Sequence, residues 1–230
     1  HLTQAPEHNV LPSDAQVLGA VKRQSQPRDV VVCAAGGLPG ELHKLWRAEG
    51  PGSYHVEYGF SCMGYEIAGG LGVKLADASR EVIVVVGDGS YLMLNSELAT
   101  SVMLGQKIIV VLLDNRGFGC INRLQRGTGN AAFNNLWADC EGTAPDIDFA
   151  AHAKAMGALA ETVGSIAELE QALSRARAAD RSYLIEIKTD PMPSTHNGSW
   201  WDVAIPEISE RSLVQDAHQQ YVTQQRRQPY

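Results

Sequence analysis

Two apolar, β-branched runs, each ending abruptly in small and oxygen-bearing residues, constrain the fold of this chain most strongly. The first, Val82–Val86, leads into Gly87–Ser90, and the second, Ile108–Leu113, leads into Asp114–Gly117. The segment between them, Asn95–Leu104, has the length of a helix. Because two strands joined through a helix usually run parallel, we expect both polar loops at the same edge of a parallel sheet.

Helical and strand patterns alternate along the rest of the chain, and no strong hairpin signal interrupts them. This alternation predicts an α/β fold, a parallel sheet of about six strands with helices on both faces. We expect a linker or arm at 1–12, a cofactor-binding domain at 13–206 and a helical tail at 207–230. The other predicted strands are Val30–Ala34, Ser53–Glu57, Ala158–Val163 and Tyr183–Lys188, and the main helices are Asp14–Gln24, Tyr65–Ala76 and Ser165–Ala179.

The charge and composition of the chain narrow its possible partners. Its 230 residues carry a formal net charge of -7 and are 44% hydrophobic, which is typical of a globular protein with a real core. A negative chain is a poor partner for nucleic acid or for an anionic membrane. No apolar run approaches the roughly 18 residues of a membrane-spanning helix. The 4 cysteines form no CxxC pair, so we expect reduced thiols in the cytoplasm.

The two polar loops carry residue types that suit a hard metal ion. Asp88 offers a carboxylate and Asn115 an amide oxygen, a set that favours Mg²⁺ or Ca²⁺ over zinc. Mg²⁺ with few protein ligands normally completes its shell with phosphate oxygens and water. These residues therefore predict a site for a metal-bridged phosphate or diphosphate. The alternative for the Asp-Gly step is a hairpin turn, which the helical segment that follows disfavours.

A third strand end, Ala35–Gly40, is rich in glycine and leads into a helix through Leu42 and Leu45. Glycines allow a ligand close to the backbone, and a helix N-terminus offers free N–H groups, so this loop is typical of a phosphate site. A tight turn between strand and helix with no ligand is an equally good interpretation of the same residues.

The spacing of these motifs resembles the thiamine-diphosphate-dependent enzymes, in particular members like acetolactate synthase. Their signature is a GDG triplet, a spacer of about 25 residues in a βαβ unit, and a terminal pair of asparagines. This chain has Asp114 in place of the first asparagine and retains the second as Asn115. The resemblance covers nearly the whole chain as the diphosphate-binding domain of that family.

The resemblance implies thiamine diphosphate and Mg²⁺ as cofactors, with a role for each matching residue. Asp88 and Asn115 would bind Mg²⁺ through side-chain oxygens and Gly117 through its carbonyl. Met63, 25 positions before Asp88, would keep the cofactor bent, and the carbonyl of Ser61 would accept from its amino group. The diphosphate would be held by the first βα loop and the GDG motif, that is by Gly37, Leu38, Gly87, Gly89 and Ser90.

The segments 54–76, 95–105, 113–125 and 193–203 resemble a narrower group within this family, whose members hydrolyse a ring C–C bond in a cyclic 1,2-dione. A small cyclic dione is therefore the implied substrate. Two alternatives stay open: acetolactate-type ligation or 2-oxoacid decarboxylation on the same scaffold, and a non-catalytic fragment that mainly dimerises.

The family activates its cofactor with a glutamate from a separate pyrimidine-binding domain. Glu57 and Glu66 lie near the expected pocket, but their spacing supports no such role. We therefore expect this chain to be the C-terminal third of a longer enzyme, inactive alone, with the pyrimidine domain supplied by the rest of that enzyme or by another subunit of a homodimer or tetramer. One hypothesis for His196, which is followed by Trp200 and Trp201, is a proton-transfer residue on a flap; a surface turn is the alternative.

Overall fold

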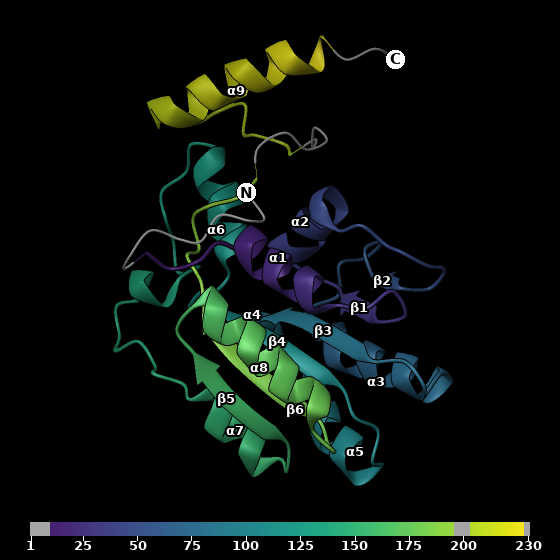
Figure 1. Ribbon diagram of the computed structural model, residues 1–230. Helices are drawn as coiled ribbons and strands as arrows, with labels where there is room; N and C mark the ends of the chain where they lie inside the picture. The colour runs from purple at the N-terminus through teal and green to yellow at the C-terminus, as the bar shows by residue number, and fades with distance from the viewer. Residues whose placement is uncertain (1–9, 196–202, 228–230) are drawn as a thin grey trace.

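A single parallel sheet forms the centre of the protein. The computed structural model describes residues 10–195 and 203–227. The strands are β1 (Val30–Cys33), β2 (Tyr54–Val56), β3 (Val82–Gly87), β4 (Ile109–Asp114), β5 (Leu159–Val163) and β6 (Tyr183–Lys188), in the order β2-β1-β3-β4-β6-β5 (Figure 1). Every neighbouring pair is parallel. The predicted α/β class and the six predicted strands are confirmed.

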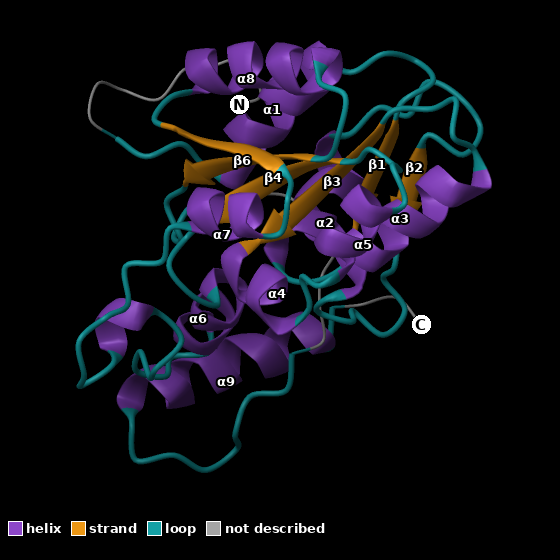
Figure 2. Ribbon diagram, turned by 90° about the horizontal axis from the view of Figure 1, so that it is seen from below, coloured by secondary structure: helices purple, strands orange, loops and turns teal. Residues whose placement is uncertain are grey.

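Helices cover both faces of the sheet because successive side chains on each strand point to opposite sides. On β3, Ile83 and Val85 join one core cluster while Val82 and Val84 join the other. The first cluster also takes in α1 (Asp14–Gln24), α2 (Gly37–Leu45) and α8 (Ile166–Ala178). The second takes in α3 (Tyr65–Ala76), α4 (Asp88–Met93), α5 (Glu97–Met103) and α7 (Phe149–Ala155). Figure 2 shows α1 and α8 on one side of the sheet and α3 and α7 on the other.

The segment between β3 and β4 contains the helix predicted over Asn95–Leu104, which is confirmed as α5, and one more helix that was not predicted. It forms two short helices, α4 and α5, and the first begins at Asp88, directly after the strand. Leu94 has extended backbone angles and ends α4. The side-chain amide of Asn95 donates to the carbonyl of Tyr91 at 2.9 Å. Such a local side-chain bond satisfies the end of the first helix and competes with its continuation.

The remaining elements lie at the end of the sheet where β4 finishes. They are α6 (Gly119–Gly127), a 3₁₀ turn at Trp137–Asp139, and α9 (Ser212–Gln225) in the predicted helical tail. The guanidinium of Arg211, just before α9, donates to the carbonyl of Gly129 at 3.3 Å, and Figure 1 shows α9 beyond α6. No helix among the described residues is long and apolar enough to cross a membrane. Most of the predicted arm, and also His196, Trp200 and Trp201, lie outside the described residues.

The strand order creates a crevice between β1 and β3. The helix after β1, α2, packs in one core cluster, while the helix after β3, α4, packs in the other through Tyr91. The two chain segments therefore diverge where the strands end. Such a topological switch point is where open α/β sheets bind ligands.

Candidate functional site

A cavity of ≈ 290 Å³ opens at the carboxyl ends of β1, β3 and β4. Its wall comes from the loops after these strands, from the segment before α3, and from α1 and α6. The structure thus brings all of the residues expected to bind cofactor or metal to one place. They are Gly37, Leu38, Ser61, Met63, Gly87, Asp88, Gly89, Ser90, Asn115 and Gly117.

Asp88 is fully buried in this wall and uses one carboxylate oxygen to join two loops. Its Oδ2 accepts a hydrogen bond of 2.7 Å from the backbone N–H of Gly117. Its Oδ1 has no hydrogen-bond partner, and neither has Oδ1 of Asn115. A buried oxygen without a hydrogen-bond partner destabilises the folded state. Two such oxygens beside one cavity therefore indicate a binding partner, such as an ion, for both. Burial, and then the charge of Asp114, raise the pKa of Asp88 to about 7.

The loop that carries Gly117 is held by backbone contacts with residues 135–137. The N–H of Phe118 donates to the carbonyl of Asn135 at 2.7 Å, and the N–H of Trp137 donates to that of Arg116 at 2.9 Å. Gly117 has φ of 141°, and a Cβ there would lie 2.4 Å from the carbonyl oxygen of Asn135. A side chain is therefore excluded by the backbone angle and by space.

The family's first asparagine position is occupied by Asp114, which does not line the cavity. Its Oδ1 accepts from the backbone N–H of Arg116 at 3.0 Å. Either a carboxylate or an amide oxygen can accept such a bond. The departure from the family pattern therefore falls on a residue that shapes the loop, while Asn115 keeps its oxygen at the cavity.

The loop after β1 places the start of α2 at the cavity. Gly36 precedes the helix with φ of 84°, and α2 begins at Gly37, inside the glycine run. The N–H groups of Gly37 and Leu38 belong to the first turn, so they have no acceptor within the helix. This end of a 9-residue helix is suited to bind an anion.

Ser90 lines the cavity, while its hydroxyl is bonded to a buried carboxylate. The hydroxyl donates to the carboxylate of Glu66, at 2.9 Å from Oε1 and 2.7 Å from Oε2. It also accepts from the N–H of Gly64 at 2.8 Å. Beside it, a Cβ on Gly89 would lie 2.7 Å from the ring of Phe118, so the two loops pack tightly.

Ser61 and Met63 reach the cavity from a loop that Glu57 organises. The carboxylate of Glu57 accepts from the N–H groups of Phe60, at 3.0 Å, and Cys62, at 2.7 Å. These bonds lower the pKa of Glu57, with the bond from Cys62 as the larger cause. Ser61 has φ of 51°, an uncommon backbone conformation for a residue other than glycine.

Sequence reasoning missed several residues of the cavity wall. Arg123 lies on α6, donates to the carbonyl of Pro191 at 2.6 Å, and covers the position that a Cβ of Gly37 would occupy. Asp14, at the start of α1, has its pKa raised to about 6 by burial, against the opposing charge of Arg123. Their sequence neighbourhoods carry no motif, because both reach the cavity only through helix packing. Phe118 and Cys120 also line it.

The donor set suits a metal that takes oxygen ligands. No group of three or more His, Cys, Asp or Glu side chains that could hold a metal converges within the described parts of the chain. A cation in the cavity would depend on the free oxygens of Asp88 and Asn115, on backbone carbonyls, and on oxygens that a ligand brings. Mg²⁺ is bound in this way beside phosphates.

Comparisons with known proteins show what this chain is similar to. The chain is 45% identical over 195 residues to a protein of Halalkalibacterium halodurans named 3D-(3,5/4)-trihydroxycyclohexane-1,2-dione hydrolase, covering 84% of this chain and 31% of the relative. A protein of the same name from Bacillus thuringiensis is 46% identical over 216 residues, covering 90% and 33%. The chain thus spans about a third of the length of the curated relatives it matches.

Two solved structures share the fold. A thiamine diphosphate-dependent 4-hydroxybenzoylformate decarboxylase from Rhodococcus jostii has a TM-score of 0.72 at 21% identity, covering 81% of this chain and 34% of that one. The benzoylformate decarboxylase from Polynucleobacter necessarius has a TM-score of 0.73 at 21% identity, covering 84% and 36%. At this identity the likeness concerns the fold alone.

A family model covers most of the chain and includes the loops after β1, β3 and β4. Described as "Thiamine pyrophosphate enzyme, C-terminal TPP binding domain", it matches residues 34–187. That span runs from the end of β1 to the end of β6 and contains every expected cofactor and metal residue. The chain therefore belongs to the thiamine pyrophosphate enzyme family, of which it contains the C-terminal TPP-binding domain.

Proposed function

We propose that the cavity at the ends of β1, β3 and β4 binds the diphosphate of thiamine diphosphate together with Mg²⁺. The observation that carries this proposal is the pair of buried oxygens without partners, Oδ1 of Asp88 and Oδ1 of Asn115. Both residues line the same cavity, which also presents the first turn of α2. A cation between the two oxygens and a diphosphate would satisfy all of these groups.

Each of the ten expected site residues has a role in this proposal. Asp88 and Asn115 hold Mg²⁺ through side-chain oxygens and Gly117 through its carbonyl. Met63 and Ser61 contact the part of the cofactor nearer its reactive end. The backbone N–H groups of the first βα loop and of the GDG motif bind the diphosphate, namely those of Gly37, Leu38, Gly89 and Ser90, with Gly87 leaving room for it.

We further propose the reaction of the whole protein to be hydrolysis of the ring C–C bond of 3D-(3,5/4)-trihydroxycyclohexane-1,2-dione, giving 5-deoxy-D-glucuronic acid in inositol breakdown. The support is the shared name of relatives at 45% and 46% identity. Bound thiamine diphosphate supplies the nucleophile and electron sink that such a cleavage needs. The residues of this chain bind and orient the cofactor and exclude water from its diphosphate end.

Other parts complete the proposed enzyme. The two glutamates near the cavity do not suit the task of activating the cofactor: Glu57 is tied to its own loop and Glu66 is enclosed in the wall. A pyrimidine-binding domain, from the rest of the protein or from another subunit of a homodimer or tetramer, is therefore part of the proposal, as is a cytoplasmic location.

Product analysis tests the reaction. The intact protein, loaded with thiamine diphosphate and Mg²⁺, is incubated with the cyclic dione, and the products are followed by NMR and mass spectrometry. We expect one open-chain acid that contains the atoms of the dione plus one water. Parallel incubations use benzoylformate, for decarboxylation, and pyruvate, for acetolactate formation. Turnover of a 2-oxoacid without turnover of the dione, or no turnover of any substrate by the loaded protein, contradicts the proposed reaction.

A further inference from the structure

A buried carboxylate lies directly behind the cavity wall. Glu66, the second residue of α3, is only 1% exposed. No ion pair within the described ranges involves it. Burial raises its pKa, and hydrogen bonds, first that from Ser90, oppose the rise. A carboxylate enclosed without a cation is costly unless several donors surround it.

The donors to Glu66 come from three different pieces of the cavity wall. The N–H of Ala35, after β1, donates to Oε1 at 3.2 Å. The N–H of Gly64, before α3, donates to Oε2 at 3.1 Å. The hydroxyl of Ser90, in α4, lies within 2.9 Å of both oxygens. One side chain thus joins the loop of the first strand, the segment that carries Met63, and the helix that follows the GDG motif.

The junction has little freedom to rearrange. Gly64 has φ of 91°, and a Cβ there would lie 2.8 Å from Cβ of Leu94, so this backbone is held in place. Its N–H donates to both Glu66 and Ser90, which closes a triangle of hydrogen bonds. The single hydrogen of the Ser90 hydroxyl is used within this triangle. Only the backbone of Ser90 is left to face an anion.

We propose that Glu66 is a positioning residue that fixes the three wall segments in the arrangement that binds the cofactor diphosphate, without touching the cofactor itself. This inference rests on the proposed function of the cavity. It differs from that function in concerning a residue that does not line the cavity. Its physical basis is that a carboxylate accepts from all three donors at once.

The variant Glu66→Gln tests this positioning role most directly. Glu66→Gln keeps the size of the side chain but has one acceptor oxygen, and its NH₂ group faces N–H or O–H donors. At least one wall segment loses its anchor. We expect the Kd for thiamine diphosphate, at saturating Mg²⁺, to rise by about 10- to 100-fold, the range found when partners of binding residues are removed. The amide hydrogens of Ala35 and Gly64 should also exchange faster.

Glu186→Gln provides a matched control. Glu186 on β6 is also a buried carboxylate, 3% exposed, and it accepts from the hydroxyl of Thr162 at 2.9 Å, but it does not line the cavity. Both variants remove a buried charge that is bonded to a hydroxyl. If Glu66 only stabilises the fold, the two variants shift Tm alike and neither changes the Kd measured well below Tm. We expect a changed Kd for Glu66→Gln alone.

Ser90→Ala keeps the test decisive if Glu66→Gln does not fold. It removes the link between α4 and Glu66 while leaving the two N–H donors an acceptor. We expect a higher Kd and faster exchange at Gly64. In the double variant Kd should match that of Glu66→Gln within about twofold, because coupled residues are not additive. Multiplicative effects, or a wild-type Kd in Glu66→Gln, overturn the positioning role, as does a wild-type Kd in Ser90→Ala where Glu66→Gln does not fold. Failure of the wild-type protein to bind thiamine diphosphate would instead overturn the proposed function.

Discussion

The backbone N–H of Gly117 donates a hydrogen bond of 2.7 Å to Oδ2 of Asp88, across two loops that follow neighbouring strands. The two oxygens of this carboxylate therefore have different roles. Oδ2 fixes the loop after β4, and Oδ1, which has no partner, remains available at the cavity. The same bond orients the backbone of Gly117, whose carbonyl is part of the proposed metal site. Loop geometry and metal binding are thus coupled through one side chain.

Replacing two glycines of α3, Gly70 and Gly72, with alanine should have opposite effects on stability. A Cβ on Gly70 would lie 2.3 Å from Cγ2 of Val84 in the core, whereas a Cβ on Gly72 would meet nothing within 4 Å. Gly70→Ala should lower the free energy of unfolding by about 1 to 3 kcal/mol through overpacking. Gly72→Ala, the matched control, should raise it by up to about 1 kcal/mol through helix propensity. Urea denaturation measures both, and equal effects would show that α3 does not approach β3 this closely.

Arg123 should contribute to the affinity for diphosphate. Its guanidinium lies against Gly37, at the end of α2 that faces the cavity, and it is the cationic side chain of the described cavity wall. Arg123→Met should raise the Kd for thiamine diphosphate about tenfold, equivalent to about 1.4 kcal/mol. Arg126→Met is the control, since Arg126 is on the same helix but exposed and outside the cavity. Equal losses in the two variants would indicate only a general field effect.

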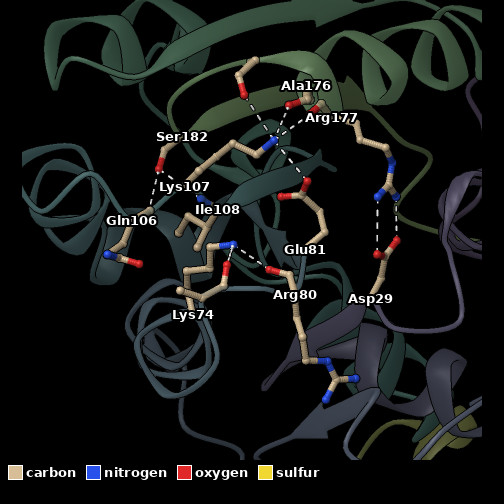
Figure 3. Close-up of polar contacts among 12 residues, drawn as sticks. Asp29, Lys74, Arg80, Glu81, Gln106, Lys107, Ile108, Ala176, Arg177 and Ser182 are labelled. Carbon is tan, nitrogen blue, oxygen red and sulfur yellow. Dashed lines mark hydrogen bonds and ion pairs between the residues drawn. The ribbon is translucent and has the colours of Figure 1, made fainter.

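Lys107 should stabilise the opposite end of the sheet without affecting the cofactor. Its ammonium group donates to the carbonyls of Ala176, Arg177 and Ala179 at 3.2, 2.8 and 3.3 Å, at the end of α8. It also pairs with Glu81 at 3.1 Å (Figure 3). Lys107→Met leaves Glu81 without its cation and the helix end without its donor, so the free energy of unfolding should fall by about 2 to 4 kcal/mol.

The control for Lys107 is Arg181→Met, because the pair of Arg181 with Asp180 is exposed at both ends. That variant should change stability by less than about 0.5 kcal/mol. The Kd for thiamine diphosphate should stay at the wild-type value in both. A loss in Lys107→Met as small as that in Arg181→Met would mean that the bonds at the end of α8 add nothing.

Strands β1, β3 and β4 could be predicted from the sequence because buried parallel strands are continuous β-branched runs. Each predicted boundary, such as Val82–Val86 against Val82–Gly87, lies within one residue of the observed one. Helix α4 was not predicted, because its start at Asp88-Gly89-Ser90 is typical of a loop and its end falls just before the predicted helix Asn95–Leu104. There the bond from Asn95 to the carbonyl of Tyr91 decides the local structure, and hydrophobic periodicity does not report it.

The same distinction applies to the candidate site. Residues after β1, β3 and β4 could be predicted to meet, because the ends of neighbouring parallel strands share one edge. Arg123 could not, because its approach to the cavity depends on how α6 packs. Glu66 was expected near the pocket, but its bonds to three wall segments depend on how α3 packs. His196 lies outside the described residues, and its role as a proton-transfer group stays a prediction.

Metal-dependent cofactor binding is the most direct test of the central claim, a shared site for Mg²⁺ and diphosphate at Asp88 and Asn115. Calorimetry on the intact protein titrates thiamine diphosphate with and without Mg²⁺, for the wild type and for Asn115→Ala. We predict binding by the wild type that requires Mg²⁺, and a Kd at least about 100-fold higher in the variant, as expected when a metal ligand itself is removed. Tight binding without metal, or the same Kd in Asn115→Ala as in the wild type, would contradict the account.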